Sequence, residues 1–312
     1  MRVVFLGTPK FAVPALQKLL DSSYDIRAVF TQPDRPAGRG HKLQPSPVKI
    51  LAAEHGIQVF QPEKIRLEEN RPIFEQLNPD YIVVVAYGQI LPGWLLASAR
   101  VGPVNIHASL LPRYRGAAPI AWAVIRGEAV TGVTTMIMDE TLDSGPVLMQ
   151  QEVLVPLAAT AGELSDELSE IGADLLIRTL DAWQRGAIEP KPQDESRVSW
   201  APRITKAIAE TAWDNKALEI HNRIRGLNPW PVAYSSFRGE RLHLWRSLPE
   251  AEVSEYRQAA GTFLGLSRDA ARVQCGEGTV LRLLEVQLPG KSRVTGREFA
   301  SGARLRAGDV IL

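Results

Sequence analysis

The sequence is poor in the residues that make covalent cross-links and metal sites. It has a single cysteine, Cys275, and five histidines spread along 312 residues. One cysteine excludes a disulfide within the chain, and the scattered histidines lack the spacing of metal ligands, so we expect no structural metal. No window holds the roughly 18 to 20 apolar residues of a membrane span, and residues 1–11 lack a secretory signal pattern. These absences predict a cytoplasmic protein without a membrane partner.

Length and charge distribution predict two folded parts with net charges of opposite sign. Hydrophobic residues make up 45% of the chain and charged residues 23%, close to the averages of globular proteins. A chain of 312 residues is long for one core, since single cores stop growing near about 250 to 300 residues. Residues 1–202 hold 19 Lys and Arg against 23 Asp and Glu, a net charge of −4, and residues 203–312 hold 17 against 12, a net charge of +5. The second part could favour a polyanion, although such an excess is also ordinary surface charge.

The first part of the chain alternates short apolar runs with helix-length segments. The runs are 2–7, 25–32, 57–61, 81–88, 103–112, 131–139 and 146–155. An amphipathic helix follows at 160–186, with Thr160 as its N-cap and Gly186 as its stop. This alternation predicts an α/β fold: a doubly wound, Rossmann-like parallel sheet that is covered on both faces. In such sheets ligands bind beyond the carboxyl ends of the strands.

The rest of the chain predicts a linker and a smaller domain. Residues 188–206 are rich in proline and polar groups and have no clear period, which is typical of a linker. After a helix expected at 215–227, short apolar segments alternate with glycine or polar turns. We therefore expect a first domain at 1–187 and a small antiparallel β-barrel at 207–312.

The densest group of reactive side chains lies where the fifth predicted strand ends. Asn105, His107 and Ser109 alternate with Ile106 and Ala108, so a period of two places the three polar residues on one face. This position is the edge of the expected ligand crevice, which favours a catalytic role. A histidine between apolar residues is also common in ordinary packed cores.

An acidic turn follows the next predicted strand. It contains Asp139, Glu140 and Asp143, and Gly145 helps to fix its bend. A carboxylate from this turn could reach His107, orient the imidazole and stabilise its charged form. The alternative for Asp143 is a turn-capping aspartate without a catalytic role.

Two common chemistries are disfavoured by the sequence. A Ser-His-Asp hydrolase would need a nucleophile elbow, but Gly-x-Ser-x-Gly is absent and Ser109 lies in an extended stretch. A dinucleotide enzyme would need G-x-G-x-x-G after the first strand, where the chain reads GTPKFA. We therefore expect neither a serine nucleophile nor a bound dinucleotide.

A long basic loop spans residues 31–49. Its basic side chains are Arg35, Arg39, His41, Lys42 and Lys49. Because prolines and glycines punctuate it, we expect neither a regular helix nor a regular strand there. Loops of this length are usually functional or disordered, and the basic groups suit phosphate contacts, although a mobile solvated loop is the alternative.

Seven strings carry a resemblance to a known family. They are FLGTPKFAVPAL, TQPDRPAGRGHKLQPSPVK, VVVAYGQILP, NIHASLLPRYRGAAPI, GVTTMIMDETLDSGPVL, IRGLNPWPVAY and CGEGTVLRLLEVQLPG. In this order they cover nearly the whole chain, which resembles the folate-dependent formyltransferase family and in particular its methionyl-tRNA formyltransferases. The chain departs from the family pattern at Thr141, where glycine is usual, and at Ala121, where glutamine is usual. A β-branched Thr141 would be strained if the turn required a positive φ at that position.

The resemblance implies roles for individual residues. The Asn, His and Asp of the family's catalytic set correspond to Asn105, His107 and Asp143. The SLLP string is associated with the reduced folate, which implies folate contacts for Ser109, Leu110, Leu111 and Pro112. A basic loop of the family grips the tRNA acceptor stem, which implies tRNA contacts for Arg35, Arg39 and Lys42. The second domain would be an oligonucleotide-binding-like (OB-like) barrel that contacts tRNA. Its net charge of +5 would then attract the tRNA phosphates.

The resemblance also implies a reaction, with alternatives left open. The α-amine of initiator methionyl-tRNA would attack the formyl carbon of 10-formyltetrahydrofolate, with no acyl-enzyme, and a monomer would suffice. Another folate formyltransferase, or a formyl-folate hydrolase acting on a small molecule, could use the same three catalytic residues. A non-catalytic tRNA-binding protein is the third alternative, but an intact set of Asn105, His107 and Asp143 disfavours it.

Overall fold

The computed structural model describes residues 1–37, 42–250 and 258–311. Its internal contacts divide the chain into two compact units, neither of which is continuous in sequence. Unit 1 consists of Met1–Gly116, Thr131–Val153 and Ser165–Trp200, and unit 2 of Ala117–Val130, Leu154–Leu164 and Ala201–Leu312. Two segments from earlier in the chain therefore fold with its C-terminal part.

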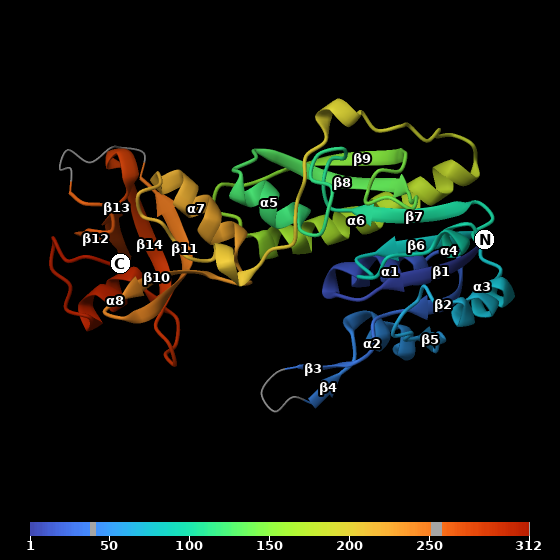
Figure 1. The fold of residues 1–312 in the computed structure, drawn as a ribbon, viewed down its shortest axis with the longest axis horizontal. Coiled ribbons are helices and arrows are strands. Elements are labelled where there is room, and N and C mark those ends of the chain that lie inside the picture. Colours follow the sequence, from blue (N-terminus) through green and yellow to red (C-terminus); the bar gives the residue numbers. More distant parts are fainter. Residues whose placement is uncertain (38–41, 251–257, 312) are drawn as a thin grey trace. The chain divides into compact units, whose positions relative to one another are not determined.

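Unit 1 is built around a seven-stranded sheet (Figure 1). In the order in which they lie side by side, the strands are β5 (Val59–Phe60), β2 (Asp25–Phe30), β1 (Arg2–Gly7), β6 (Tyr81–Val85), β7 (Gly102–His107), β8 (Val130–Ile137) and β9 (Val147–Leu154). The first five are parallel, which confirms the doubly wound architecture. β8 is antiparallel to β7, so the expectation of a wholly parallel sheet is wrong. His107 at the end of β7 pairs with Thr134 in the middle of β8, because the chain returns antiparallel beside β7 instead of crossing over to a parallel position.

Helices cover both faces of this sheet. They are α1 (Val13–Leu20), α2 (Pro47–Glu54), α3 (Arg71–Leu77), α4 (Gly93–Leu96) and α6 (Ala161–Gln184), with 3-10 turns η1 (Lys10–Ala12), η2 (Glu68–Asn70) and η3 (Glu195–Arg197). α6 packs against the face that carries Ile106, since a Cβ on Gly172 would lie 3.0 Å from the Ile106 Cγ2 atom. Phe74 of α3 and Leu95 of α4 belong to a buried cluster with Val84, on the opposite face. Asn105 and His107 share this second face, because side chains alternate along β7.

The predicted ends of α6 are confirmed. The Thr160 hydroxyl accepts a hydrogen bond from the Glu163 backbone N at 3.2 Å, and the Glu163 carboxylate accepts one from the Thr160 N at 2.9 Å. This reciprocal pair is a capping box. Gly186 has a φ of +65°, which suits the end of a helix. Among the helices of the described chain, none is both long enough and apolar enough to cross a bilayer.

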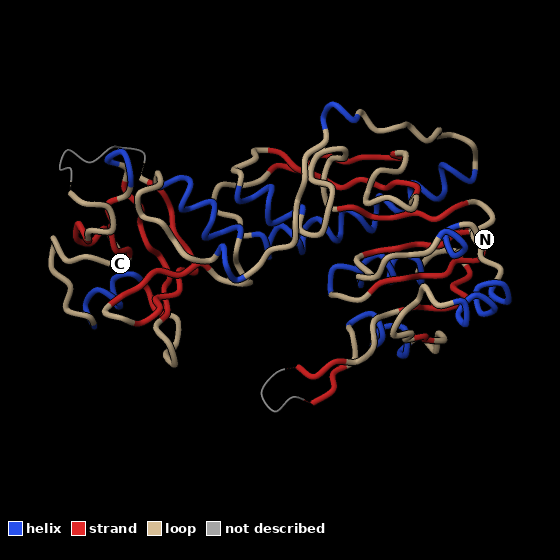
Figure 2. The backbone as a smooth tube through the Cα atoms, viewed as in Figure 1, coloured by secondary structure: helices blue, strands red, loops and turns tan. Residues whose placement is uncertain are grey.

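The basic loop contains regular structure that the sequence did not predict. β3 (Arg35–Ala37) and β4 (Lys42–Gln44) form an antiparallel pair, which Figure 2 shows as two short strands side by side. The expectation of no strand in 31–49 is therefore wrong. Pro36 is tolerated because both members of an isolated pair are edge strands, where the absence of one N–H disrupts no sheet. α2 then begins at Pro47, capped by the Ser46 hydroxyl.

Unit 2 is an antiparallel β unit with three packed helices. Along the sheet its strands are β10 (Ala233–Phe237), β11 (Glu240–Pro249), β14 (Val280–Gln287), β13 (Ala270–Gln274) and β12 (Phe263–Ser267), with β15 (Val294–Thr295) beside β14. Its helices are α5 (Pro119–Ile125), α7 (Ala217–Gly226) and α8 (Gly296–Gly302), with the turns η4 (Lys206–Ile208) and η5 (Gly276–Gly278). α5 approaches α7 closely, since a Cβ on Gly226 would lie 3.1 Å from the Ala121 carbonyl oxygen. The expected small antiparallel β domain is therefore confirmed.

Candidate active site

β7 places two of the predicted catalytic side chains next to each other on one face. Asn105 is 8% exposed and His107 is 6% exposed. Their face of the sheet is opposite to α6, because Ile106 between them points at Gly172. Within the described chain, the side-chain amide of Asn105 makes no hydrogen bond, so its N–H donors are available to a ligand. That is the feature expected of a group that binds a carbonyl oxygen or an oxyanion.

His107 has an acceptor oxygen near each ring nitrogen. Its Nε2 atom lies 2.9 Å from the Tyr114 carbonyl oxygen. Because a carbonyl only accepts, Nε2 carries a hydrogen and donates it. Its Nδ1 atom lies 3.7 Å from the Asp143 Oδ2 atom. The carboxylate thus faces the imidazole within ion-pairing distance, and the predicted approach of Asp143 to His107 is present.

The Asp143 turn differs from its predicted geometry in one respect. Asp143 itself has a φ of +52°, whereas Thr141 is not among the positive-φ residues of the described chain. The expected strain therefore falls on Asp143, and the β-branched side chain of Thr141 meets no such conflict. The Thr141 hydroxyl and backbone N both donate to the Asp139 carboxylate, at 2.7 and 2.9 Å. Aspartate adopts a left-handed backbone more readily than most residues, which suits its position here.

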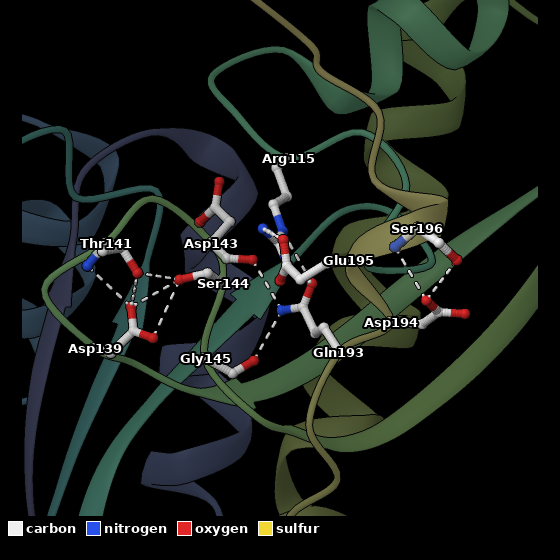
Figure 3. A network of polar contacts seen from close by, with 10 residues as sticks. All are labelled: Arg115, Asp139, Thr141, Asp143, Ser144, Gly145, Gln193, Asp194, Glu195 and Ser196. Atoms are coloured by element: carbon white, nitrogen blue, oxygen red, sulfur yellow. Dashed lines mark hydrogen bonds and ion pairs between the residues drawn. The ribbon is translucent and has the colours of Figure 1, made fainter.

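A polar network that sequence reasoning missed surrounds this turn (Figure 3). Gln193 donates from its Nε2 atom to the backbone carbonyls of Asp143 and Gly145, at 2.9 and 2.8 Å. The guanidinium of Arg115 donates to the Gln193 Oε1 atom and to both Glu195 carboxylate oxygens. Gln193 and Glu195 lie in the predicted linker, where no local pattern distinguishes them. Arg115 lies in the RYRG string, but nothing in the sequence indicates its partners.

Two residues of the SLLP string are buried and two are partly exposed. The Ser109 hydroxyl is fully buried and donates to the Arg113 carbonyl at 2.6 Å. It is therefore engaged with backbone, which agrees with the rejection of a serine nucleophile. Leu111 is buried and precedes a cis bond to Pro112, while Leu110 and Pro112 are partly exposed. The implied folate contacts of these four residues stay a prediction.

Two of the three predicted tRNA residues, Arg35 and Lys42, belong to the β3–β4 pair. Arg35 is exposed on β3 and Lys42 begins β4, while Arg39 and His41 lie outside the described residues. Lys49 is committed to partners within unit 1, since its Nζ atom lies 2.7 Å from both the Asp34 carboxylate and the Gln61 amide oxygen. The hydrogen bond from Lys49 lowers the pKa of Asp34. Lys49 is therefore less suited to a phosphate contact than the sequence indicated.

Comparison with known proteins identifies the family. Residues 1–180 match the family described as formyl transferase, and residues 203–304 match the formyl transferase C-terminal domain. A methionyl-tRNA formyltransferase of Alkaliphilus metalliredigens (strain QYMF) is 46% identical over 99% of this chain and 97% of its own. One from Clostridioides difficile (strain 630) is 44% identical over the full length of both chains.

Solved structures show the same fold at lower identity. A sugar 3N-formyl transferase, solved in the presence of dTDP and 5-N-formyl-THF, has a TM-score of 0.69 at 17% identity, covering 94% of this chain and 99% of its own. HypX from Aquifex aeolicus, in complex with tetrahydrofolic acid, has a TM-score of 0.60 at 18% identity, covering 96% of this chain and 47% of its own. The family assignment rests on the sequence matches, which extend from end to end. This chain belongs to the formyl transferase family, among its methionyl-tRNA formyltransferases.

Proposed function

We propose that this protein transfers the formyl group of 10-formyltetrahydrofolate to the α-amino group of initiator methionyl-tRNA, with Asn105, His107 and Asp143 as its catalytic residues. The observation that carries the assignment of these residues is their convergence at the end of β7, where Asp143 faces His107 beside the available amide of Asn105. The full-length identity of 46% to a methionyl-tRNA formyltransferase supports the choice of acceptor.

The reaction begins with attack of the amine on the formyl carbon. The formyl oxygen then becomes the oxyanion of a tetrahedral intermediate, and the bond to the folate nitrogen breaks when this intermediate collapses. Asn105 donates from its amide to that oxyanion, and His107 donates from its ring. A donor aimed at a developing oxyanion contributes about 3 to 4 kcal/mol in measured cases.

His107 must exchange a hydrogen bond before it can serve the oxyanion. In the present structure its Nε2 atom donates to the Tyr114 carbonyl, and its Nδ1 atom faces Asp143. Catalytic hydrogen bonds commonly reach their final geometry only in the complex with substrate. Binding of the formyl donor therefore replaces Tyr114 as the acceptor of the His107 proton.

Two protons move during the transfer. The attacking amine loses one, and the leaving folate nitrogen gains one. Asp143 holds His107 in orientation, accepts the proton of the amine through water and returns it through water to the leaving folate nitrogen, while His107 stabilises the intermediate between the two steps. Much of the remaining acceleration comes from holding two substrates in contact.

The acceptor is tested by single-turnover transfer of labelled formyl from 10-formyltetrahydrofolate, with methionylated initiator tRNA and free methionine as parallel acceptors. We expect formylation of the charged tRNA alone. Formylation of free methionine would favour a small-molecule formyltransferase, and release of formate without an acceptor would favour a formyl-folate hydrolase. Tight tRNA binding without turnover would favour a binding protein.

Several expectations accompany this proposal. Ser109, Leu110, Leu111 and Pro112 are the proposed folate contacts, and Arg35, Arg39 and Lys42 the proposed tRNA contacts. The functional domains are proposed at 1–187 and 207–312, with a linker at 188–206. A monomeric state and a cytoplasmic location also remain predictions.

A further inference from the structure

Residues 191–200 form a strap along unit 1 that is tied at both ends. Near its start, the backbones of Lys191 and Val147 exchange two hydrogen bonds of 2.8 Å. Near its end, Ser199 accepts from the Arg115 N through its carbonyl and from the Tyr114 N through its hydroxyl, both at 2.9 Å. Tyr114 is the residue whose carbonyl binds His107. The strap therefore contacts both loops that carry partners of His107.

Within the strap, the amide of Gln193 has one possible orientation. Its oxygen accepts from the Arg115 Nε and Nη2 atoms at 3.0 and 2.8 Å, and its nitrogen donates to the Asp143 and Gly145 carbonyls at 2.9 and 2.8 Å. A guanidinium only donates and a carbonyl only accepts, so a flipped amide would lose all four bonds. Gln193 is thus a fixed bridge between Arg115 and the backbone of the acidic turn.

Arg115 is held just as firmly on its other side. It is 4% exposed, and its guanidinium contacts both carboxylate oxygens of Glu195, at 2.7 and 3.2 Å. Such a two-point pair adds geometric restraint as well as attraction. Arg115 therefore presents its remaining N–H groups to Gln193 in a set position.

The turn that receives these bonds requires support. Asp143 has a φ of +52°, a conformation that costs free energy in a non-glycine residue and is stabilised here by its surroundings. The Gly116 backbone N donates to the Asp143 Oδ2 atom at 2.8 Å, which fixes the carboxylate, and Gln193 fixes the backbone. Because Oδ2 lies 3.7 Å from the His107 Nδ1 atom, a small shift of the turn would change the contact of the two proposed catalytic groups.

From this geometry we infer that Gln193 is a positioning residue for the reaction: through its two bonds to the 143–145 backbone it holds the Asp143 carboxylate against His107. The inference rests on the proposed catalytic role of Asp143. It assigns a function to a residue of the predicted linker that touches no reacting atom. Its effect on the rate must then pass entirely through Asp143.

The test is a double-mutant cycle that combines Gln193→Glu with Asp143→Asn in the full chain. Gln193→Glu keeps the size of the side chain and an acceptor for Arg115, but it removes both N–H donors and places a carboxylate against two carbonyl oxygens. Gln151→Glu is the matched control, since the Gln151 Oε1 atom also accepts from an arginine, Arg178, at 3.0 Å. Single-turnover transfer, the KM for each substrate and the melting temperature are measured for every variant.

We expect Gln193→Glu to lower the rate of transfer about 10- to 100-fold, as misplacement of a catalytic group by about 1 Å does. The KM values and the melting temperature should stay near those of the parent, and Gln151→Glu should leave all of them unchanged. In the Asp143→Asn background, Gln193→Glu should cause no further loss, because the residue it positions is already impaired.

Three outcomes would overturn the inference. They are an unchanged rate for Gln193→Glu, an equal fold-loss in both backgrounds, and a loss accompanied by a lower melting temperature and raised KM values, which would mean a general structural role. A full rate for Asp143→Asn alone would instead contradict the proposed catalytic role of Asp143. The experiment therefore distinguishes failure of that proposal from failure of the positioning role of Gln193.

Discussion

Asp143 illustrates how a single residue depends on its distant neighbours. A left-handed backbone costs a non-glycine residue about 1 to 2 kcal/mol, and Asp143 adopts it with a φ of +52°. Hydrogen bonds from Gly116 and Gln193 hold it there. The departure from the family pattern raised the possibility of a positive φ at Thr141. In the structure the positive φ lies two residues later, at Asp143, one of the proposed catalytic residues.

Asn105 offers the most direct test of oxyanion stabilisation. Asn105→Ala should lower the rate of transfer about 100- to 1000-fold, since it removes one donor without introducing charge. Single-turnover transfer measures the rate, and a binding assay with initiator tRNA is the control, which should be unaffected. A rise in KM with an unchanged rate would contradict the proposal, because an interaction made only in the transition state affects the chemical step.

His221 on α7 predicts a pH-dependent stability. It is 1% exposed, donates to the Leu157 carbonyl at 2.7 Å and accepts from the Ser247 hydroxyl at 3.0 Å. Burial lowers the pKa of His221 from its ordinary value of 6.5. The unfolded chain therefore binds a proton more readily, so the stability is present above that ordinary pKa and is lost as the pH falls below it.

The melting temperature of the full chain should consequently decrease between about pH 7.5 and about pH 5.5, and His221→Gln should reduce that decrease. Burial also lowers the pKa of His243, which leaves a residual dependence. His55→Gln, at an exposed position, is the control and should keep the slope of the parent. An unchanged slope in His221→Gln would show that this group does not set the pH response.

At the scale of elements, the β3–β4 pair is attached to unit 1 by a compact polar cluster. Lys49 and Asp34 form an ion pair of 2.7 Å, and the Gln61 amide donates to Asp34 at 2.7 Å and to the Gln32 carbonyl at 2.9 Å. Both charged side chains are about two-thirds buried. The cluster restrains the two chain segments from which the strand pair projects.

Lys49→Ala should therefore weaken tRNA binding without affecting the folate. We expect the KM for methionyl-tRNA to rise about threefold to tenfold, which is the size of effect that a partly buried ion pair supports. Initial rates at varied concentrations of each substrate measure this change. Lys64→Ala, which removes the same charge from an exposed site of unit 1, is the control. An equal rise for both variants would mean that charge alone, and not the anchoring of the strands, is responsible.

At the scale of the whole molecule, the C-terminal part is completed by segments from earlier in the chain. Arg225 is 4% exposed and donates to the Pro156 and Ala159 carbonyls, both at 3.2 Å. His221 binds the Leu157 carbonyl. All three acceptors precede α6, about 60 to 70 residues before α7. α5 also packs against α7.

A fragment of residues 201–312 should consequently be less stable than unit 2 within the full chain. It would lose the acceptors of Arg225 and His221, and unsatisfied buried donors cost about 1 to 3 kcal/mol each. Limited proteolysis and thermal melting of the fragment measure the difference, and a longer chain that begins at residue 117 should recover much of it. A fragment that melts at the temperature of the full chain would show that these contacts contribute little.

The sequence alone determined the features that depend on near neighbours. The period of two along β7 placed Asn105 and His107 on one face, and Thr160 and Gly186 marked the ends of α6. The alternation of strands and helices predicted the parallel core of the sheet. Each of these signals arises within a few residues, because side-chain alternation, capping and helix termination are local properties of the backbone.

Only the tertiary structure decided which distant segments meet. Gln193 reaches Asp143 across 50 residues, and Arg115 reaches Gln193 across 78. The reversal of the chain after β7, the strand pair in the basic loop and the joining of residues 117–130 and 154–164 to unit 2 likewise had no local signature. The sequence around a hydrogen-bond donor in a loop does not indicate which distant residue will be its acceptor. The partner is selected when tertiary packing brings the two segments together and leaves each buried polar group in need of one.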